Sequence, residues 1–190
     1  MKLMERDQRG FTLIELVVGV FIIALVVLGA SMAIIQLVNA GRSSTHMTAL
    51  RQVQTAGFWV SGDGLQAQIV VDNDPETLAI DVYDDPETDG TEILILQWTD
   101  WDDGDVYEIQ YSLQDMPSGT LKKLWRYETI TPEVGDPTSH TTLVAQYIDG
   151  NATSCEWTSE TKQAFTFDVA ATVEQQTESR TYEIKPRPLA

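Results

Sequence analysis

Residues 9–38 read RGFTLIELVVGVFIIALVVLGASMAIIQLV, and the fold of the whole chain follows from this stretch. Across residues 16–38 only two positions are clearly polar, Ser31 and Gln36. An α-helix rises about 1.5 Å per residue, so an apolar run of about 28 residues is long enough to span roughly 30 Å of hydrocarbon. We therefore expect a transmembrane helix over residues 11–38.

A short charged leader, residues 1–10, precedes the apolar stretch and ends in Gly10. A secretory signal peptide has the opposite arrangement, because its small-residue cleavage site lies beyond the apolar core. No Ala-x-Ala site occurs here before the chain becomes polar at Asn39. The basic residues of the leader favour a cytoplasmic N-terminus, which would leave the acidic remainder beyond the inner membrane.

Glu15 is a carboxylate near the start of the membrane segment. On insertion scales, placing such a residue in the membrane costs about 2.5 kcal/mol or more, so it needs a charged partner or a position at the membrane surface. A cut before Phe11 would create an amino group four residues away, in the same chain or in a neighbouring one, that could pair with Glu15. Alternatively, Glu15 reaches the lipid headgroups from an interfacial position. These residues alone leave both interpretations open.

The run RGFTLIELVVG, residues 9–19, resembles the signature of bacterial type IV prepilins. The resemblance implies that a membrane prepilin peptidase cuts between Gly10 and Phe11 and N-methylates Phe11. It also implies that Glu15 helps to recruit and register subunits in a filament. The implied partners are the peptidase, other minor and major pilins or pseudopilins, an inner-membrane assembly platform, and membrane lipid before assembly.

A second pattern extends over about 80 residues of the C-terminal part and consists of Tyr107, Tyr111, Ser112, Leu113, Leu121, Leu124, Trp125, Arg126, Leu143, Tyr147 and Trp157. This looser pattern is similar to that of J-type minor pseudopilins of type II secretion and of W-type minor pilins. It implies a minor subunit at or near a filament tip. Many major pilins have a proline about twenty residues after the cut, where this chain has Met32, and a single cysteine excludes their C-terminal disulfide loop. The retained Glu15 argues against the tip pseudopilin type that lacks it.

The expected fold class is α+β, with a long N-terminal helix packed on an antiparallel β-sheet head. We predict one helix from about Thr12 to about Val60, frayed at residues 61–64 and resuming through Ile69. Residues 39–72 would form its exposed amphipathic half, and residues 73–190 an acidic, β-rich head. The predicted strands are Leu78–Tyr83, Glu92–Trp98, Val106–Leu113, Leu121–Glu128, Ala164–Val173 and Thr181–Ile184, with a turn at 175–178 and a short strand or helix at 143–148.

The charge is strongly negative, with 12 Lys and Arg against 29 Asp and Glu, a formal net charge of −17. No basic residue occurs between Arg51 and Lys122. Such a surface repels phosphate backbones, so we expect the head not to bind nucleic acid directly. The lone Cys155 and the two histidines, His46 and His140, give no catalytic grouping, and we expect a buried Cys155 and no enzymatic activity.

Two acidic loops are candidates for a hard cation. The four carboxylates Asp100, Asp102, Asp103 and Asp105 could bind Ca²⁺ through oxygen atoms, as could those of residues 84–90. The spacing departs from an EF-hand loop, because Gly104 stands where a third ligand should be. Plain solvated turns are the alternative, and no other cofactor is expected.

The sequence leaves two further functions open. One is an uncut single-pass membrane protein with an acidic binding ectodomain, and the other is a subunit of a DNA-uptake pilus. The prepilin signature separates the first from a filament subunit, whereas nothing in the sequence distinguishes the possible filament machines.

Overall fold

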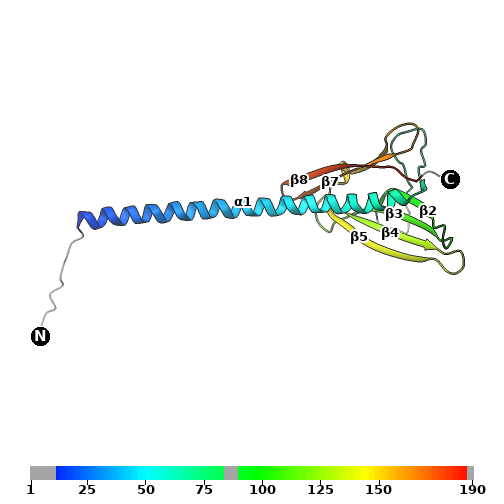
Figure 1. The fold of residues 1–190 in the computed structure, drawn as a ribbon. Coiled ribbons are helices and arrows are strands. Elements are labelled where there is room, and N and C mark those ends of the chain that lie inside the picture. The colour runs from blue at the N-terminus through cyan, green and yellow to red at the C-terminus, as the bar shows by residue number, and fades with distance from the viewer. Residues whose placement is uncertain (1–11, 84–89, 188–190) are drawn as a thin grey trace. The chain divides into compact units, whose positions relative to one another are not determined.

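The computed structural model describes residues 12–83 and 90–187 of the 190-residue chain. The chain divides into two compact units, residues 1–43 and 44–190, which are described separately. Helix α1, Leu13–Gln66, contributes its first part to the N-terminal unit and its second part to the C-terminal unit (Figure 1).

In the N-terminal unit, the apolar side chains of α1 are exposed on every side. Phe21 is 65% exposed and Leu37 is 75% exposed. No charged residue occurs between Glu15 and Arg42. A helix that is apolar all round needs lipid or other protein around it. Within the described residues, α1 is the one helix long and apolar enough to cross a membrane.

The C-terminal unit is built on an eight-stranded antiparallel sheet in the order β1-β2-β3-β4-β5-β7-β6, with β8 paired to β7. Between β5 and β7 a single residue pair, Ile148 with Ala171, joins the ladder. Figure 1 shows β7 and β8 on one side of the second part of α1 and β2 to β5 on the other. The strands are β1 (Ile69–Val70), β2 (Thr91–Thr99), β3 (Val106–Asp115), β4 (Lys122–Thr131), β5 (Thr138–Ile148), β6 (Ser154–Trp157), β7 (Phe165–Val173) and β8 (Gln176–Ile184); a short 3₁₀ helix, Gly150–Ala152, precedes β6.

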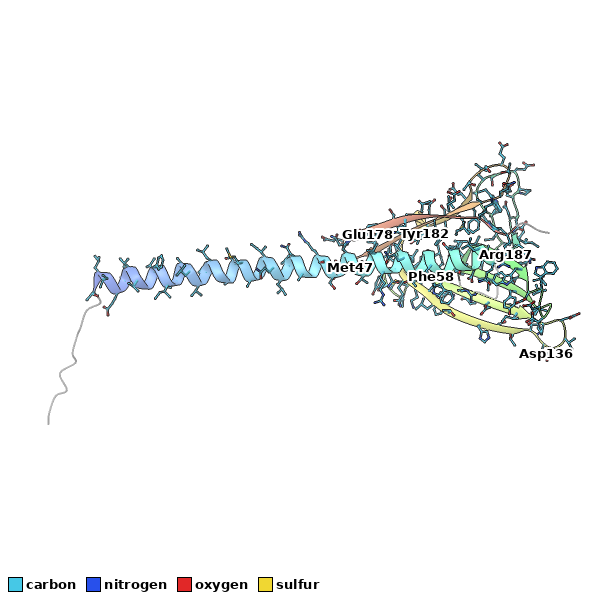
Figure 2. The ribbon with its side chains drawn as sticks, in the orientation of Figure 1. Met47, Phe58, Asp136, Glu178, Tyr182 and Arg187 are labelled. Carbon is cyan, nitrogen blue, oxygen red and sulfur yellow. The ribbon has the colours of Figure 1, made fainter. Side chains whose placement is uncertain are left out.

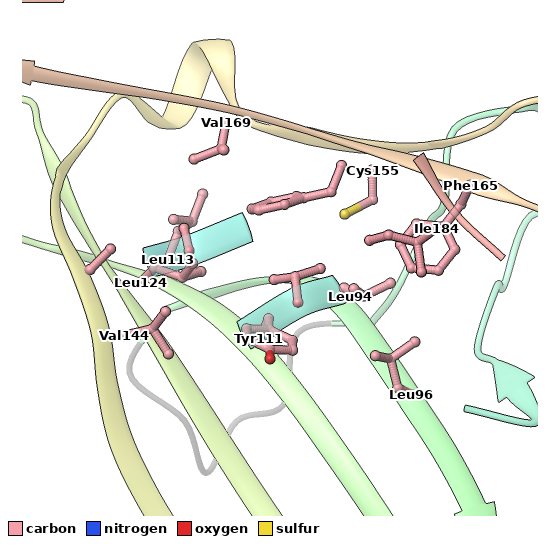
Figure 3. Close-up of a cluster of buried hydrophobic side chains, with 14 of the residues drawn as sticks. Leu94, Leu96, Tyr111, Leu113, Leu124, Val144, Cys155, Phe165, Val169 and Ile184 are labelled. Carbon is pink, nitrogen blue, oxygen red and sulfur yellow. The ribbon is translucent and has the colours of Figure 1, made fainter. Parts of the chain in front are cut away.

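The second part of α1 packs on the sheet through one face of small residues. The buried positions recur every three or four residues, as one face of a helix requires. Gly57 lies directly under the Tyr182 ring, and Gly64 lies against Ile184. The strands supply larger apolar side chains to the same core, as Figure 3 shows around Tyr111. The buried residues of α1 are Ala49, Val53, Ala56, Gly57, Val60, Asp63 and Gly64.

Two expectations about the helix are wrong. The helix does not fray at residues 61–64 but continues to Gln66, because Asp63 and Gly64 are buried against the sheet. It also does not resume through Ile69, which instead begins β1 and pairs with Gln97 of β2. Tertiary contacts therefore outweigh the low helix propensity of the two glycines in this stretch.

The strand predictions are confirmed for β2, β3, β4 and β7, with differences at their ends. The strand expected at Leu78–Tyr83 is wrong: this segment makes only an isolated bridge, from Ala79 to Glu156 of β6. Neither β1 nor β6 was expected, since both are very short. Segment 143–148 is part of the eleven-residue β5.

The last hairpin is tighter than expected. Val173 pairs with Gln176, so the turn consists of Glu174 and Gln175 rather than residues 175–178, and β8 begins at Gln176 instead of Thr181. Glu174 has a φ of 56°, the left-handed conformation that two-residue hairpin turns require. The sequence has no glycine there to signal it.

Candidate functional site

The N-terminus of α1 is closed by reciprocal hydrogen bonds between Thr12 and Glu15. The Glu15 backbone N–H donates to Thr12 Oγ1 at 3.4 Å. In return, the Glu15 carboxylate accepts from the Thr12 backbone N–H at 3.0 Å and from its hydroxyl at 2.9 Å. This arrangement is a capping box, which satisfies backbone donors that the first helical turn leaves unpaired. Glu15 therefore has a partner within its own chain.

A hollow lies next to Glu15 on the surface of α1. It has a volume of about 370 Å³ and is lined by Ile14, Glu15, Val18, Gly19 and Ile22. Gly19 has no atom within 4 Å of the place where a Cβ would stand, so the hollow is open beside the carboxylate. An apolar side chain of another helix could approach the helix backbone closely at this position.

Gly10 and Phe11, the predicted cleavage and methylation residues, lie outside the described residues. Their roles stay predictions, as does the role of Glu15 in assembly. What the structure adds is that the helix begins immediately after Thr12, so a cut before Phe11 would leave two residues ahead of α1.

The comparison with known families bears on this same segment. A family model described as the prokaryotic N-terminal methylation motif matches residues 6–31. The chain carries a prokaryotic N-terminal methylation motif. No curated protein and no solved structure matches the chain. The matched residues include the predicted cut, the capping box and most of the apolar part of α1.

The methylation motif and the fold agree with each other. A helix with an apolar N-terminal part, whose C-terminal part packs on an antiparallel sheet, is a pilin-like α+β architecture. Together, the motif and the apolar helix support a type IV pilin-like precursor that is anchored in a membrane by a single span.

The acidic loop between β2 and β3 is organised by its own backbone. The Asp100 carboxylate accepts from the Asp102 N–H at 3.0 Å, and that of Asp103 accepts from the Asp105 N–H at 3.1 Å. Among residues 12–83 and 90–187, no group of three or more His, Cys, Asp or Glu side chains is placed to hold a metal. Calcium binding at Asp100, Asp102, Asp103 and Asp105 stays a prediction, and most of the other acidic loop lies outside the described residues.

The surroundings of Cys155 and His46 are those of residues that contribute to packing. Cys155 is 5% exposed in the core, where burial raises the pKa of its thiol. A reactive thiol needs the opposite, an exposed position and a lowered pKa. His46 Nδ1 lies 2.8 Å from a Glu178 carboxylate oxygen, which connects α1 to β8.

The head contains a buried ion pair that the sequence pattern did not predict. Arg126 Nε donates to Asp63 Oδ2 at 2.7 Å, and Tyr111 donates to the same oxygen at 2.5 Å. Burial alone would lower the pKa of Arg126, but its hydrogen bonds to Asp63 and Glu128 raise it. The guanidinium also lies 5.3 Å from the centre of the Trp59 ring.

One feature of the sequence indicates this ion pair. Along β4, Leu124 and Arg126 are two residues apart and therefore face the same side of the sheet. An arginine on the apolar side of a strand needs a buried acidic partner. The segment Ser61-Gly62-Asp63-Gly64 predicts a frayed helix end, which gives Asp63 no buried position.

Proposed function

We propose that this protein is a type IV pilin-like subunit that is cut between Gly10 and Phe11, N-methylated at Phe11, and assembled into a filament. The observation that carries the proposal is the methylation motif over residues 6–31, which continues directly into the apolar, capped helix α1. The proposed activity is mechanical rather than enzymatic. Before assembly the protein is held in the inner membrane with its N-terminus in the cytoplasm and its head outside.

Assembly moves α1 from lipid into a bundle of equivalent helices. An assembly ATPase and a platform protein in the membrane lift each subunit, and the apolar residues 11–38 then lie among their neighbours. Burial of this surface holds the filament together. Glu15 gives register, because an unpaired carboxylate in such a core costs roughly several kcal/mol. The hollow beside Gly19 provides close access to that carboxylate.

Within this class, we propose a minor subunit of a type II secretion pseudopilus or a type IV pilus, located at or near the filament tip. The support is the resemblance to J-type and W-type minor subunits. Two pairs of residues in that pattern are direct cross-strand partners in the core, Tyr111 with Arg126 and Leu113 with Leu124. Four of the eleven residues in the pattern thus pack together in the head.

Gly10→Leu tests the cleavage. The substitution puts a bulky side chain at the last position of the leader, and we expect the chain to keep its leader and stay out of filaments. The measurement is the mass of the membrane-extracted protein, with Gly41→Leu as a matched change at an open position outside the matched motif. If the Gly10→Leu protein has the same mature length as the wild type, the chain is not a prepilin and reverts to a single-pass protein with an acidic ectodomain.

Glu15→Ala tests the assembly role separately. We expect normal removal of the leader but at least a tenfold loss of the protein from sheared filaments, because neither the capping box nor the carboxylate remains. Thr12→Ala is the matched variant, since it removes the cap and keeps the carboxylate. Incorporation of Glu15→Ala at the wild-type level would contradict the proposed role of Glu15.

A further inference from the structure

The C-terminal unit contains a basic pocket at the end of β8. Its volume is about 390 Å³, and the side chains of Lys162, Lys185 and Arg187 all line it. The whole chain has 12 basic residues against 29 acidic ones, so three cations around one concavity contrast with the rest of the protein. We call this feature the basic pocket.

The backbone after β8 brings two of the cations to the same side. Lys185 precedes Pro186, which favours an extended conformation, and side chains two residues apart in an extended segment face the same way. The Arg187 backbone N–H donates to the Ala67 carbonyl at 2.8 Å, which fixes this segment beside the end of α1 (Figure 2). Lys185 and Arg187 therefore face the pocket together.

The third cation is held by the core. Lys162 Nζ lies 2.5 Å from Asp72 Oδ2 and 5.7 Å from the centre of the Trp157 ring. Trp157 Nε1 donates to the same Asp72 oxygen at 2.9 Å. Lys162 has a φ of 50°, a conformation that a lysine rarely adopts. This wall of the pocket is consequently formed before any ligand arrives.

The charges in the pocket are not balanced. Asp72 compensates Lys162, and its side chain is only 7% exposed. Among residues 12–83 and 90–187, neither the Lys185 ammonium nor the Arg187 guanidinium has an acidic partner. Both residues are exposed. The pocket can therefore accept an anionic group without breaking an existing ion pair.

We propose that the basic pocket binds the carboxylates of an acidic peptide segment presented by a partner protein. The planar guanidinium of Arg187 can hold one carboxylate with two parallel hydrogen bonds, and Lys185 acts as a second point charge. The side chain of Gln163, which also lines the pocket, can bond to the peptide backbone. The volume is in the range of natural ligand sites.

The net charge of the whole protein determines which kind of anion can reach the basic pocket. A net charge of −17 repels an extended polyanion such as nucleic acid outside the pocket. A short segment with two to four carboxylates makes its contacts within the pocket, and salt screens repulsion beyond about 10 Å. The proposal does not rest on cleavage or filament assembly. Its test is a binding measurement, whose result does not depend on whether the leader is cut or the protein enters a filament.

The test uses the full chain in detergent micelles and a synthetic peptide, TDWDDGDV, blocked at both ends. This peptide copies residues 99–106, an exposed acidic segment of the chain itself, and serves as a probe of the right chemistry. The readout is the indole N–H resonance of Trp157 in an NMR titration, since Trp157 lines the pocket. The control peptide has asparagine in place of every aspartate.

We expect saturable binding of the acidic peptide, a shift of the Trp157 resonance, and at least tenfold weaker binding of the asparagine peptide. Lys185→Gln with Arg187→Gln should weaken binding at least tenfold. Lys122→Gln with Lys123→Gln removes the same charge from β4 and should change the peptide affinity less than threefold. Equal losses of affinity in the two double variants would mean that only the overall charge of the protein matters, and would overturn the proposal. So would tighter binding of inorganic phosphate than of the peptide, or the absence of saturable binding.

Discussion

Arg126 shows at the scale of a single residue how the head fixes its helix. Its side chain is 8% exposed and contacts Asp63 from α1, Glu128 from its own strand, and the ring of Trp59. Removing two charges from water is costly, so such a pair contributes little net stability compared with apolar side chains of the same volume. Its effect is on specificity, because any other rotation or register of α1 would leave a charge buried without a partner.

Arg126→Met should therefore destabilise the head by about 3–5 kcal/mol, because the buried Asp63 carboxylate keeps the Tyr111 hydrogen bond but loses its compensating cation. The double variant Asp63→Leu with Arg126→Met should recover part of that loss, because both charges are removed while the buried Tyr111 hydroxyl loses its acceptor. Urea unfolding followed by tryptophan fluorescence measures both. Lys122→Met breaks the exposed ion pair with Asp115 and serves as the control, with little expected effect. A double variant as unstable as Arg126→Met alone would contradict this account.

Asp72 is a second residue whose surroundings in the fold matter, because they lower the pKa of its carboxyl group. Burial would raise the pKa of its carboxyl, but hydrogen bonds from Lys162, Trp157 and the Asp81 backbone lower it below the usual value. A lowered folded-state pKa stabilises the protein above the unfolded value of about 3.9, and this contribution is lost as the pH falls through the folded value.

Asp72→Asn should thus reduce the melting temperature at pH 7, and the difference from the wild type should shrink steadily below about pH 4. Thermal unfolding of both proteins between pH 2.5 and 7 measures this. Asp74→Asn is the neighbouring control, because its side chain caps a turn without an ion pair. A difference that grows as the pH falls would show that the sign is wrong.

At the scale of elements, the second part of α1 lies as close to the sheet as its glycines permit. A Cβ on Gly57 would stand 2.0 Å from a carbon of the Tyr182 ring, which is far inside contact distance. A Cβ on Gly62 would meet nothing within 4 Å. Two glycines of one helix thus have opposite surroundings, one packed and one open.

Gly57→Ala should destabilise the head by about 1–3 kcal/mol, because the Tyr182 ring must move. Gly62→Ala should instead stabilise it by up to about 1 kcal/mol, because alanine favours the helix and meets no obstacle. Chemical unfolding of the two single variants gives the comparison. Gly57→Ala as stable as Gly62→Ala would mean that β8 does not lie on this face of α1.

The elements that could be predicted from the sequence are those with strong local patterns. The first part of α1 is a continuous apolar run without proline. Strand β3 alternates between apolar and polar residues over Ile109–Leu113, whereas β2 contains an unbroken apolar run, Ile93–Leu96. The misplaced elements depend on long-range partners instead. The continuation of α1 to Gln66 depends on Arg126. Leu78–Tyr83 is not a strand because its pairing with β6 is a single bridge, Ala79 with Glu156.

The same limit applies to the candidate site. The motif around Gly10, Phe11 and Glu15 is contiguous, so the sequence contains all of it. The Thr12–Glu15 capping box was also present as a Thr-x-x-Glu pattern, although it was not recognised as one. The basic pocket could not have been found in this way, since Lys162 and Arg187 meet only through the pairing of β7 with β8.

At the scale of the whole molecule, the protein joins two chemically opposite units. The described part of residues 1–43 is an apolar helix suited to lipid or to other helices, and residues 44–190 form an acidic head with its own core. Strong negative charge keeps such heads soluble and apart in solution. These two parts agree with the proposed function, in which the helix passes from the membrane into a filament while the head keeps its own fold.

The mass and N-terminal modification of the mature protein test this account most directly. The protein would be extracted from membranes of cells with and without a prepilin peptidase, digested, and its N-terminal peptide identified by mass spectrometry. We predict an N-methylated peptide that begins at Phe11 only where the peptidase is present, and an intact leader where it is absent. A chain that keeps Met1 in both membranes, or one cut near Asn39, would contradict the assignment as a pilin-like precursor.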